Sequence, residues 1–178
     1  YSLSDIHQTL RSVSDLEIDE FGDVWLAGVP GLYRFTKQKS DWKYTPYSEL
    51  FGASYIDQNI SNKSNQILDH VFSSHTDRLY MGTKNGDGVL VYEIAQDSFW
   101  ALRYQSGTHS TDVLITSLCE DEHGRLWIGT KKNGLLYYDI GQERIHKIDI
   151  GLDDGDPISA LAYLPPHLYI GIIFEGAT

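Results

Sequence analysis

Short apolar segments alternate with polar turns along most of this chain. Four of them follow one another closely: Ile115–Glu120, Arg125–Thr130, Leu135–Ile140 and Arg144–Ile150. Each is rich in β-branched and aromatic residues and is bounded by turn-forming residues, as antiparallel strands are. No part of the sequence shows a sustained apolar period of 3.6 residues, so we predict almost no helix. The pattern predicts an all-β protein in which four consecutive strands form one unit.

This four-strand unit recurs along the chain. Aromatic residues mark the same strand position in four copies: Trp25, Tyr80, Trp127 and Tyr169. An Asp-x-x-Gly turn precedes the tryptophan in the first and third copies, at Asp19–Gly22 and Asp121–Gly124. The corresponding turn of the second copy, Ser74–Asp77, lacks the glycine, and that of the fourth is built on Pro165 and Pro166. A four-stranded repeat of roughly 45 residues is typical of a β-propeller blade.

We therefore predict an all-β fold, a β-propeller fragment with three complete four-stranded blades and two strands of a fourth. The expected boundaries are 1–12 for a leading segment, 13–66 for blade 1 with a long final loop, 67–114 for blade 2, 115–157 for blade 3 and 158–178 for an incomplete blade 4. Because a closed propeller has at least about four blades, we expect this chain to supply half of a larger ring.

Charge and cysteine content narrow the classes of partner. The chain has 14 lysine and arginine residues against 25 aspartate and glutamate residues, a net charge of −11. Such a surface repels phosphate backbones and anionic lipid, so we expect no nucleic-acid binding and no membrane contact by this segment. The single cysteine, Cys119, excludes an intrachain disulfide and a cysteine-based metal site. We expect its thiol to be buried and inert.

The third copy resembles a known repeat. The segment Asp121-Glu-His-Gly124-Arg-Leu-Trp127-Ile-Gly129-Thr130, followed by Gly134-Leu135, is similar to the two-component regulator propeller pattern D-x-x-G-x-[LI]-W-[IL]-G-T-x-x-x-G-[LI]. The first copy departs from this pattern at Ala27 and Gly28, and the second and fourth copies are degenerate. On this basis the structural repeat positions are Gly22, Trp25, Tyr80, Gly82, Gly124, Trp127, Gly129, Gly134, Tyr169 and Gly171.

The resemblance implies a cellular context. Repeats of this family build the sensor half of bacterial transmembrane receptors, in which the propellers lie outside the cytoplasmic membrane and a histidine kinase or another output domain follows. Glycan-responsive hybrid two-component regulators are known users of the repeat. The resemblance therefore implies a periplasmic location and a sensing role, and it carries no catalytic residue to transfer to this sequence.

The conserved-looking repeat residues admit a functional and a structural interpretation. The four aromatic residues Trp25, Tyr80, Trp127 and Tyr169 could stack on sugar rings, but their shared strand position favours core packing between blades. Asp19 and Asp121 could bind a metal or act in catalysis. Their Asp-x-x-Gly spacing instead favours a turn in which aspartate accepts backbone hydrogen bonds and glycine takes a positive φ. The histidines lack metal-ligand spacing. We therefore predict no catalytic residue, no metal site and no cofactor.

The loops predict a binding surface. In a four-stranded antiparallel blade, the second-to-third-strand turn and the connection to the next blade emerge on the same rim. That rim then carries the long loop after blade 1, whose length is typical of functional loops, together with two lysine-containing turns. The candidate ligand-binding residues are Tyr47, Phe51, Tyr55, Asp57, Asn59, Lys84, Asn85, Asp87, Lys131, Lys132, Asn133 and Glu175. Aromatic, amide and charged groups together suit a polar ligand.

Three functions remain open from the sequence. The favoured one is a ligand-sensing module without catalysis, which binds a small polar ligand or oligosaccharide and contacts the remaining blades of the same receptor or a second copy in a homodimer. The second is a propeller lyase or glycoside hydrolase, which would need convergent carboxylates or a His–Glu pair in one cleft. The third is a scaffold whose rim binds protein.

Overall fold

The computed structural model of the chain describes residues 12–19, 21–29, 31–36, 41–46, 67–73, 75–84, 88–96, 98–106, 109–110, 113–152 and 155–173. These residues form strands and turns, with one 3-10 turn at Ile94–Gln96. Three four-stranded antiparallel sheets and two strand pairs follow one another along the chain. Within the described ranges, no helix has the length and apolar character needed to cross a membrane.

Each four-stranded sheet is a meander in which the strands pair in sequence order. Blade 1 consists of β1 (Ser12–Ile18), β2 (Val24–Val29), β3 (Gly31–Thr36) and β4 (Asp41–Pro46). Blade 2 consists of β5 (Ile67–Ser73), β6 (Arg78–Thr83), β7 (Val89–Glu93) and β8 (Ser98–Leu102). Blade 3 consists of β11 (Ile115–Glu120), β12 (Leu126–Thr130), β13 (Leu135–Asp139) and β14 (Arg144–Ile148).

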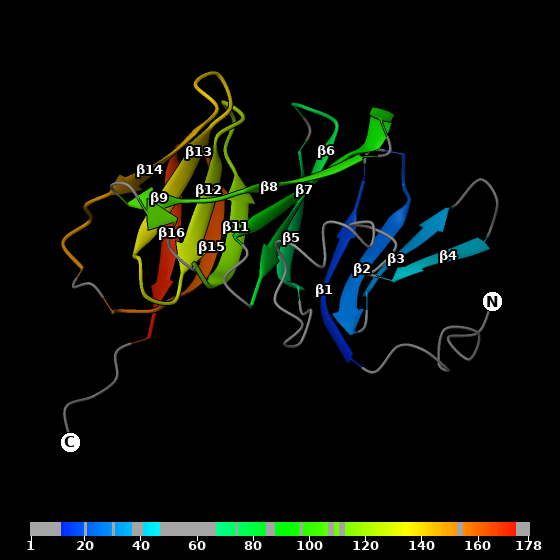
Figure 1. The fold of residues 1–178 in the computed structure, drawn as a ribbon, viewed down its shortest axis with the longest axis horizontal. Helices are drawn as coiled ribbons and strands as arrows, with labels where there is room; N and C mark the ends of the chain where they lie inside the picture. The colour runs from blue at the N-terminus through cyan, green and yellow to red at the C-terminus, as the bar shows by residue number, and fades with distance from the viewer. Residues whose placement is uncertain are drawn as a thin grey trace.

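Two strand pairs complete the described structure. The pair β15 (Ile158–Leu164) and β16 (His167–Ile172) forms the first half of blade 4. A small hairpin of β9 (Gln105–Ser106) and β10 (His109–Ser110), which the sequence pattern does not predict, lies in the connection from blade 2 to blade 3. Figure 1 shows the sheets in order, from β1–β4 in blue and cyan to β15 and β16 in orange and red.

The first strand of each blade packs against the blade before it. Strand β5 contacts β1 and β2, β11 contacts β5 and β6, and β15 contacts β11 and β12. Each first strand also carries a register shift against its second strand, at Val13/Asp15, Ile67/Asp69, Ile115/Ser117 and Ile158/Ala160. A β-bulge therefore recurs at one position of every blade, where it bends the strand and changes the direction of its side chains.

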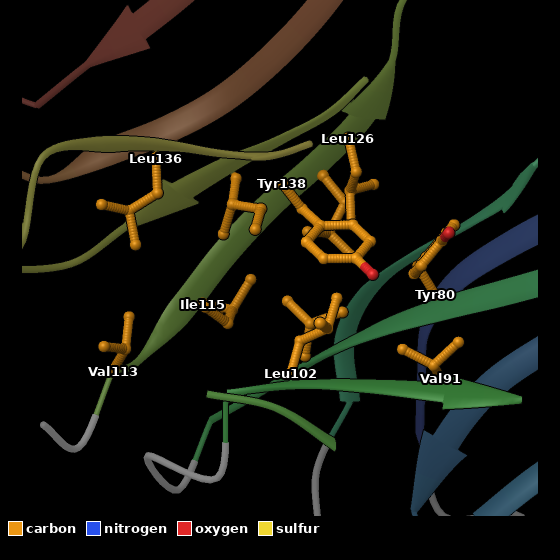
Figure 2. Close-up of a cluster of buried hydrophobic side chains, with 11 residues drawn as sticks. Tyr80, Val91, Leu102, Val113, Ile115, Leu126, Leu136 and Tyr138 are labelled. Carbon is orange, nitrogen blue, oxygen red and sulfur yellow. The ribbon is translucent and has the colours of Figure 1, made fainter. Parts of the chain in front are cut away.

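The hydrophobic core consists of layers between neighbouring blades. Strand β6 is apolar on both faces because it lies between two such layers: Leu79 and Met81 pack with blade 1, and Tyr80 packs with blade 3. In the layer between blades 2 and 3, side chains from the two sheets meet face to face (Figure 2). That layer includes Tyr80, Val91, Leu102, Val113, Ile115, Leu126, Leu136 and Tyr138.

The observed architecture confirms the predicted fold class of three four-stranded blades and two strands of a fourth. The four aromatic repeat positions are not equivalent, however, so the expectation that all four lie in the core is wrong. Trp25 and Tyr80 are buried and Trp127 is half-buried, whereas Tyr169 is 53% exposed. Tyr169 lies on β16, the last described strand, and no further sheet of the described chain covers it.

Candidate ligand-binding rim

The Asp-x-x-Gly turns hold both the backbone and the tryptophan. Asp121 Oδ1 accepts hydrogen bonds from the N–H groups of His123 and Arg125 at 2.9 and 3.0 Å. Asp121 Oδ2 accepts one from the indole N–H of Trp127 at 2.9 Å. Gly124 has a φ of 75°, in the left-handed region that favours glycine. The turn interpretation agrees with this geometry, although sequence reasoning missed the bond between aspartate and indole.

Blade 1 repeats the arrangement. Asp19 Oδ1 accepts hydrogen bonds from the N–H groups of Phe21 and Asp23 at 3.0 and 2.8 Å, and Asp19 Oδ2 accepts one from the Trp25 indole at 2.9 Å. Gly22 has a φ of 77°. The carboxylates of both turns thus accept hydrogen bonds within their own hairpins, which is a structural role.

Blade 2 builds this turn from different residues. Ser73 Oγ accepts hydrogen bonds from the N–H groups of His75 and Thr76, both at 3.2 Å, and so takes the place of the aspartate carboxylate. Asp77 adopts a φ of 54° where blades 1 and 3 have glycine. The turn therefore starts at Ser73 rather than at Ser74 as expected, because one residue is inserted relative to blade 3.

The Gly-Thr pair of the repeat has a separate role on the opposite rim. Thr130 Oγ1 donates a hydrogen bond to the carbonyl of Gly134 at 2.7 Å and accepts one from the Asn133 N–H at 2.8 Å. Thr83 Oγ1 likewise donates to the carbonyl of Gly88 at 2.8 Å. Gly134 and Gly88 have φ values of 69° and 84°. The threonine thus fixes the shape of the turn that follows the second strand.

The structure places this turn beside the connection into the blade, as the topology predicts. The N–H of Lys131 donates a hydrogen bond to the carbonyl of Leu114 at 3.0 Å, which joins the turn after β12 to the segment before β11. Lys131 and Lys132 are exposed and Asn133 is half-buried. Lys84, in the equivalent turn of blade 2, is also exposed. These four are the candidate ligand residues that lie within the described chain.

The other eight candidates lie outside the described residues: Tyr47, Phe51, Tyr55, Asp57, Asn59, Asn85, Asp87 and Glu175. Their convergence on the rim therefore stays a prediction.

A groove opens next to the blade 3 turn, which sequence reasoning missed. It has a volume of about 470 Å³ and is lined by Gly134, Leu135, Lys147, Ile148, Asp149, Ile150 and Leu152. Its lining comes from the start of β13, the end of β14 and the residues after β14, and its charged groups, Lys147 and Asp149, have opposite signs. A groove with apolar residues and a few charged groups suits a polar ligand with an apolar face. No local motif marks it, because it depends on the path of the chain after β14.

A second groove lies between the outer strand of blade 2 and blade 3. It has a volume of about 630 Å³, and its lining includes Trp100, Tyr138, Arg78 and Glu93. Here the charged groups pair with each other: Arg78 Nε lies 2.8 Å from Glu93 Oε1, which also accepts a hydrogen bond from the Trp100 indole at 3.2 Å. These contacts fix the position of the Trp100 indole, and they engage the charged groups of Arg78 and Glu93 with other groups of the protein.

Two half-buried aspartates lie close together on the first strands of blades 1 and 2. Asp15 Oδ2 lies 2.7 Å from His70 Nδ1, and hydrogen bonds link the carboxyl groups of Asp15 and Asp69. Burial, together with the neighbouring Asp15 carboxyl, raises the pKa of Asp69 to about 6. Burial opposes ionisation of Asp15, but hydrogen bonds from His70 and Asp69 outweigh it and hold the pKa of Asp15 well below its usual range. The pair therefore retains one shared proton over a wide pH range.

The structure also shows the environment of Cys119 and of the side chains that could bind a metal. Cys119 is half-buried in β11, and burial raises the pKa of its thiol to about 12, so the unreactive protonated form dominates at neutral pH. Within the described part of the chain, no group of three or more histidine, cysteine, aspartate or glutamate side chains is placed to hold a metal ion.

Comparison with known proteins supports the repeat assignment. Residues 110–132 match the family model of the two component regulator propeller. This span contains β11, β12 and the Asp121–Trp127 turn between them, so the first half of blade 3 matches this repeat and the resemblance is confirmed there. No curated protein matches the chain at a significant level.

Solved structures match most of the chain at low identity. The extracellular domain of BT3049 from B. thetaiotaomicron, described as a hybrid two component system, is 18% identical over 93% of this chain and 23% of its own, with a TM-score of 0.71. The corresponding domain of BT4673 from the same organism is 20% identical over 88% of this chain and 19% of its own, with a TM-score of 0.66. Virginiamycin B lyase from Staphylococcus aureus is 9% identical over 87% of this chain and 47% of its own, with a TM-score of 0.66.

These matches establish the shared β-propeller fold. The chain spans about a fifth of the length of the two extracellular domains that it matches.

Proposed function

We propose that this chain is a propeller segment in the ligand-sensing, periplasmic part of a bacterial two-component-type receptor. The observation that carries the proposal is the two-component regulator propeller repeat at residues 110–132, inside an ordered series of four-stranded blades. The likeness to extracellular domains of two-component systems supports the same context. The segment has no catalysis of its own, and it contacts further blades of the same receptor.

The ligand is a carbohydrate or another small polar molecule, bound on the loop-rich rim. Lys131 and Lys132 stand on this rim beside the groove lined by Lys147 and Asp149, which offers charged hydrogen-bonding groups beside apolar residues. The aromatic residues of the long loop, Tyr47, Phe51 and Tyr55, are expected to add stacking surfaces.

Calorimetry on the 178-residue chain tests the proposal, with oligosaccharides of neutral hexoses and of uronic acids as probes. One class should bind, and replacing Lys131 and Lys132 by glutamate should weaken that binding at least ~10-fold, because charge-assisted hydrogen bonds are lost. Arg144→Glu, which makes the charge change of one of these substitutions at the start of β14 on the opposite rim, should leave the affinity unchanged. Equal loss in both variants would remove the rim from the site.

The long loop has its own test. Replacing Tyr47, Phe51 and Tyr55 by alanine should weaken binding of the same probe without lowering the melting temperature. Unchanged affinity would remove the loop from the site.

A lyase or glycoside hydrolase is the competing function. The buried aspartates of the repeat, Asp19 and Asp121, accept hydrogen bonds in their own turns, which argues against a catalytic role for them. Mass analysis of the probe after incubation separates the two functions: an intact oligosaccharide agrees with sensing, and cleavage would establish an enzyme.

A further inference from the structure

A hydrogen bond of the same kind recurs between each pair of consecutive blades that the structure describes. The residue at the bulge of each first strand accepts it through its side chain, and the donor is a backbone N–H of the next first strand. The three bonds are His70 N–H to Asp15 Oδ2 at 2.9 Å, Leu118 N–H to Asp69 Oδ2 at 2.6 Å and Leu161 N–H to Ser117 Oγ at 3.0 Å. The donors occupy one repeat position, directly after the bulge, and so do the acceptors.

An apolar contact accompanies this bond. The first residue of the bulge, Ile115 in blade 3 and Ile158 in blade 4, packs on the glycine of the preceding second strand. A Cβ at Gly82 would lie 2.5 Å from Ile115 Cγ2, and a Cβ at Gly129 would lie 2.7 Å from Ile158 Cγ2. Only glycine, or alanine after a small shift, leaves room there. The glycine of the repeat therefore leaves a recess, called the socket, that receives the isoleucine of the next blade.

The face of blade 1 that points away from blade 2 is called the leading face. It carries the residues that correspond to those by which blades 3 and 4 pack on the blade before them. Val13 and Leu16 occupy the positions of Ile115 and Leu118. Ile115 is 2% exposed and Leu118 5%, whereas Val13 is 50% exposed and Leu16 53%. The difference arises because Ile115 and Leu118 are covered by blade 2, while the described chain supplies no sheet in front of β1.

The face of blade 4 that points away from blade 3 is called the trailing face. It has the glycine that would receive a following blade, but it lacks the hydrogen-bond acceptor. Gly171 provides the socket: the three atoms nearest to a Cβ there all belong to β15 of its own sheet. At the bulge, however, the acceptor position is Ala160, whose methyl group cannot accept a hydrogen bond. A second copy docked on this face would leave its Leu16 N–H buried without a partner, at a cost of about 1–3 kcal/mol.

We propose that the leading face, formed by Val13, Leu16, Ile18 and Phe21, docks on a propeller blade that differs from blade 4 of this chain. That blade carries an aspartate, serine or similar acceptor at its first-strand bulge and a glycine or alanine in the second-strand socket. The acceptor receives the Leu16 N–H, and the socket receives Val13. The interface continues the one that joins the blades within the chain, and the acceptor selects which blades can be neighbours.

The proposal can be tested on the full chain by giving the trailing face the hydrogen-bond acceptor that it lacks. Ala160→Asp supplies the missing acceptor, so head-to-tail association of two copies, measured by sedimentation equilibrium, should tighten by roughly 10- to 100-fold, since a charged acceptor forms a strong hydrogen bond. Ala162→Asp is the matched control, because it adds the same charge to β15 two residues away from the bulge. It should bring no gain.

A further variant shows that the two named faces form the contact. Val13→Arg in the Ala160→Asp background should return association to the level of the unmodified chain, because arginine does not fit the Gly171 socket. Circular dichroism shows whether each variant keeps its β-structure. If Ala160→Asp associates no more tightly than Ala162→Asp, the acceptor does not select the neighbour. If the unmodified chain already associates as tightly as Ala160→Asp, a second copy is the natural occupant, and the proposal is wrong.

Discussion

At the scale of single residues, one carboxylate organises each Asp-x-x-Gly turn. Asp121 is buried although it is charged, which is tolerated because it accepts hydrogen bonds from two backbone N–H groups and from the Trp127 indole. Arg125 adds a further bond at 2.7 Å. The aspartate therefore positions the tryptophan that the repeat requires, and the spacing of six residues between them follows from the length of the hairpin turn.

This role predicts the effect of removing the carboxylate. Asp121→Ala should lower the free energy of unfolding by about 3 kcal/mol, because buried donors lose a charged acceptor. Chemical denaturation measures the change. Glu122→Ala, at the exposed neighbouring position, should change stability by no more than about 0.5 kcal/mol. Equal effects at the two positions would contradict the assigned role of Asp121.

The Asp15–Asp69 pair predicts a pH dependence of stability. The pKa of Asp69 is raised from 3.8 to about 6, so its stabilising contribution is complete below pH 3.8 and is lost as the pH rises towards 6. The pKa of Asp15 is lowered, so its contribution is present above pH 3.8 and is lost as the pH falls below that value. The combined contribution of the pair is therefore largest near pH 3.8 and decreases on both sides of that value.

Asp69→Asn isolates the Asp69 contribution, because the amide oxygen can still accept the Leu118 N–H. The free energy of unfolding of the parent chain should fall by about 1 kcal/mol more between pH 5 and pH 7.5 than that of the variant. Asp149→Asn, at an exposed position, should follow the parent. A parent and an Asp69→Asn chain with parallel pH profiles would show that Asp69 titrates normally.

At the scale of strands, the sequence pattern predicts the blades well because alternation and turn chemistry are local. In blade 3, the predicted Arg125–Thr130 and Leu135–Ile140 are observed as Leu126–Thr130 and Leu135–Asp139. The extra residue in the Ser73 turn escaped detection, because serine and Asp77 replace the two residues that mark the turn elsewhere. Exposure of Tyr169 could not be predicted from its repeat position, since burial there depends on the blade that follows.

The site is less visible in the sequence than the strands. The lysines after β12 could be placed on the loop-rich rim because strand direction alone fixes the side on which a turn emerges. The groove beside them depends on the path that the chain takes after β14, along Asp149, Ile150 and Leu152, and no spacing rule predicts that path. The links between blades likewise depend on residues that are paired only in space.

The socket interpretation predicts a coupling between strands of different blades. Gly129→Ala should destabilise the chain by about 1–3 kcal/mol, because its Cβ would press on Ile158. Gly171→Ala changes the equivalent glycine on β16, where no isoleucine of a following blade lies above it, and should cost less. Adding Ile158→Ala to Gly129→Ala should recover part of the loss in a double-mutant cycle, measured by denaturation. Strictly additive effects would exclude the contact as the cause.

At the scale of the whole molecule, the two ends of the blade series expose apolar surface that internal blades bury. Leu16, Ile18 and Phe21 are exposed on the leading face, and Leu164, Tyr169 and Ile173 on the trailing face. Exposed apolar patches and open sheet edges promote association. The fold therefore presents its two ends as candidate interfaces.

These ends predict the behaviour of the isolated chain. At about tens of micromolar it should self-associate weakly, with a sedimentation coefficient that rises with concentration, because apolar faces are removed from water on contact. Leu16→Lys together with Ile18→Lys should reduce this association, since the charged groups resist burial. Gln96→Lys with Gln142→Lys adds the same charge at exposed positions outside both faces and should leave association in place. Weak association of the unmodified chain is also what the missing acceptor at Ala160 leads us to expect, because the apolar contact can form without the hydrogen bond that completes it. A cooperative, strictly monomeric chain over the same concentration range would show that the two faces are stable in water and do not act as interfaces.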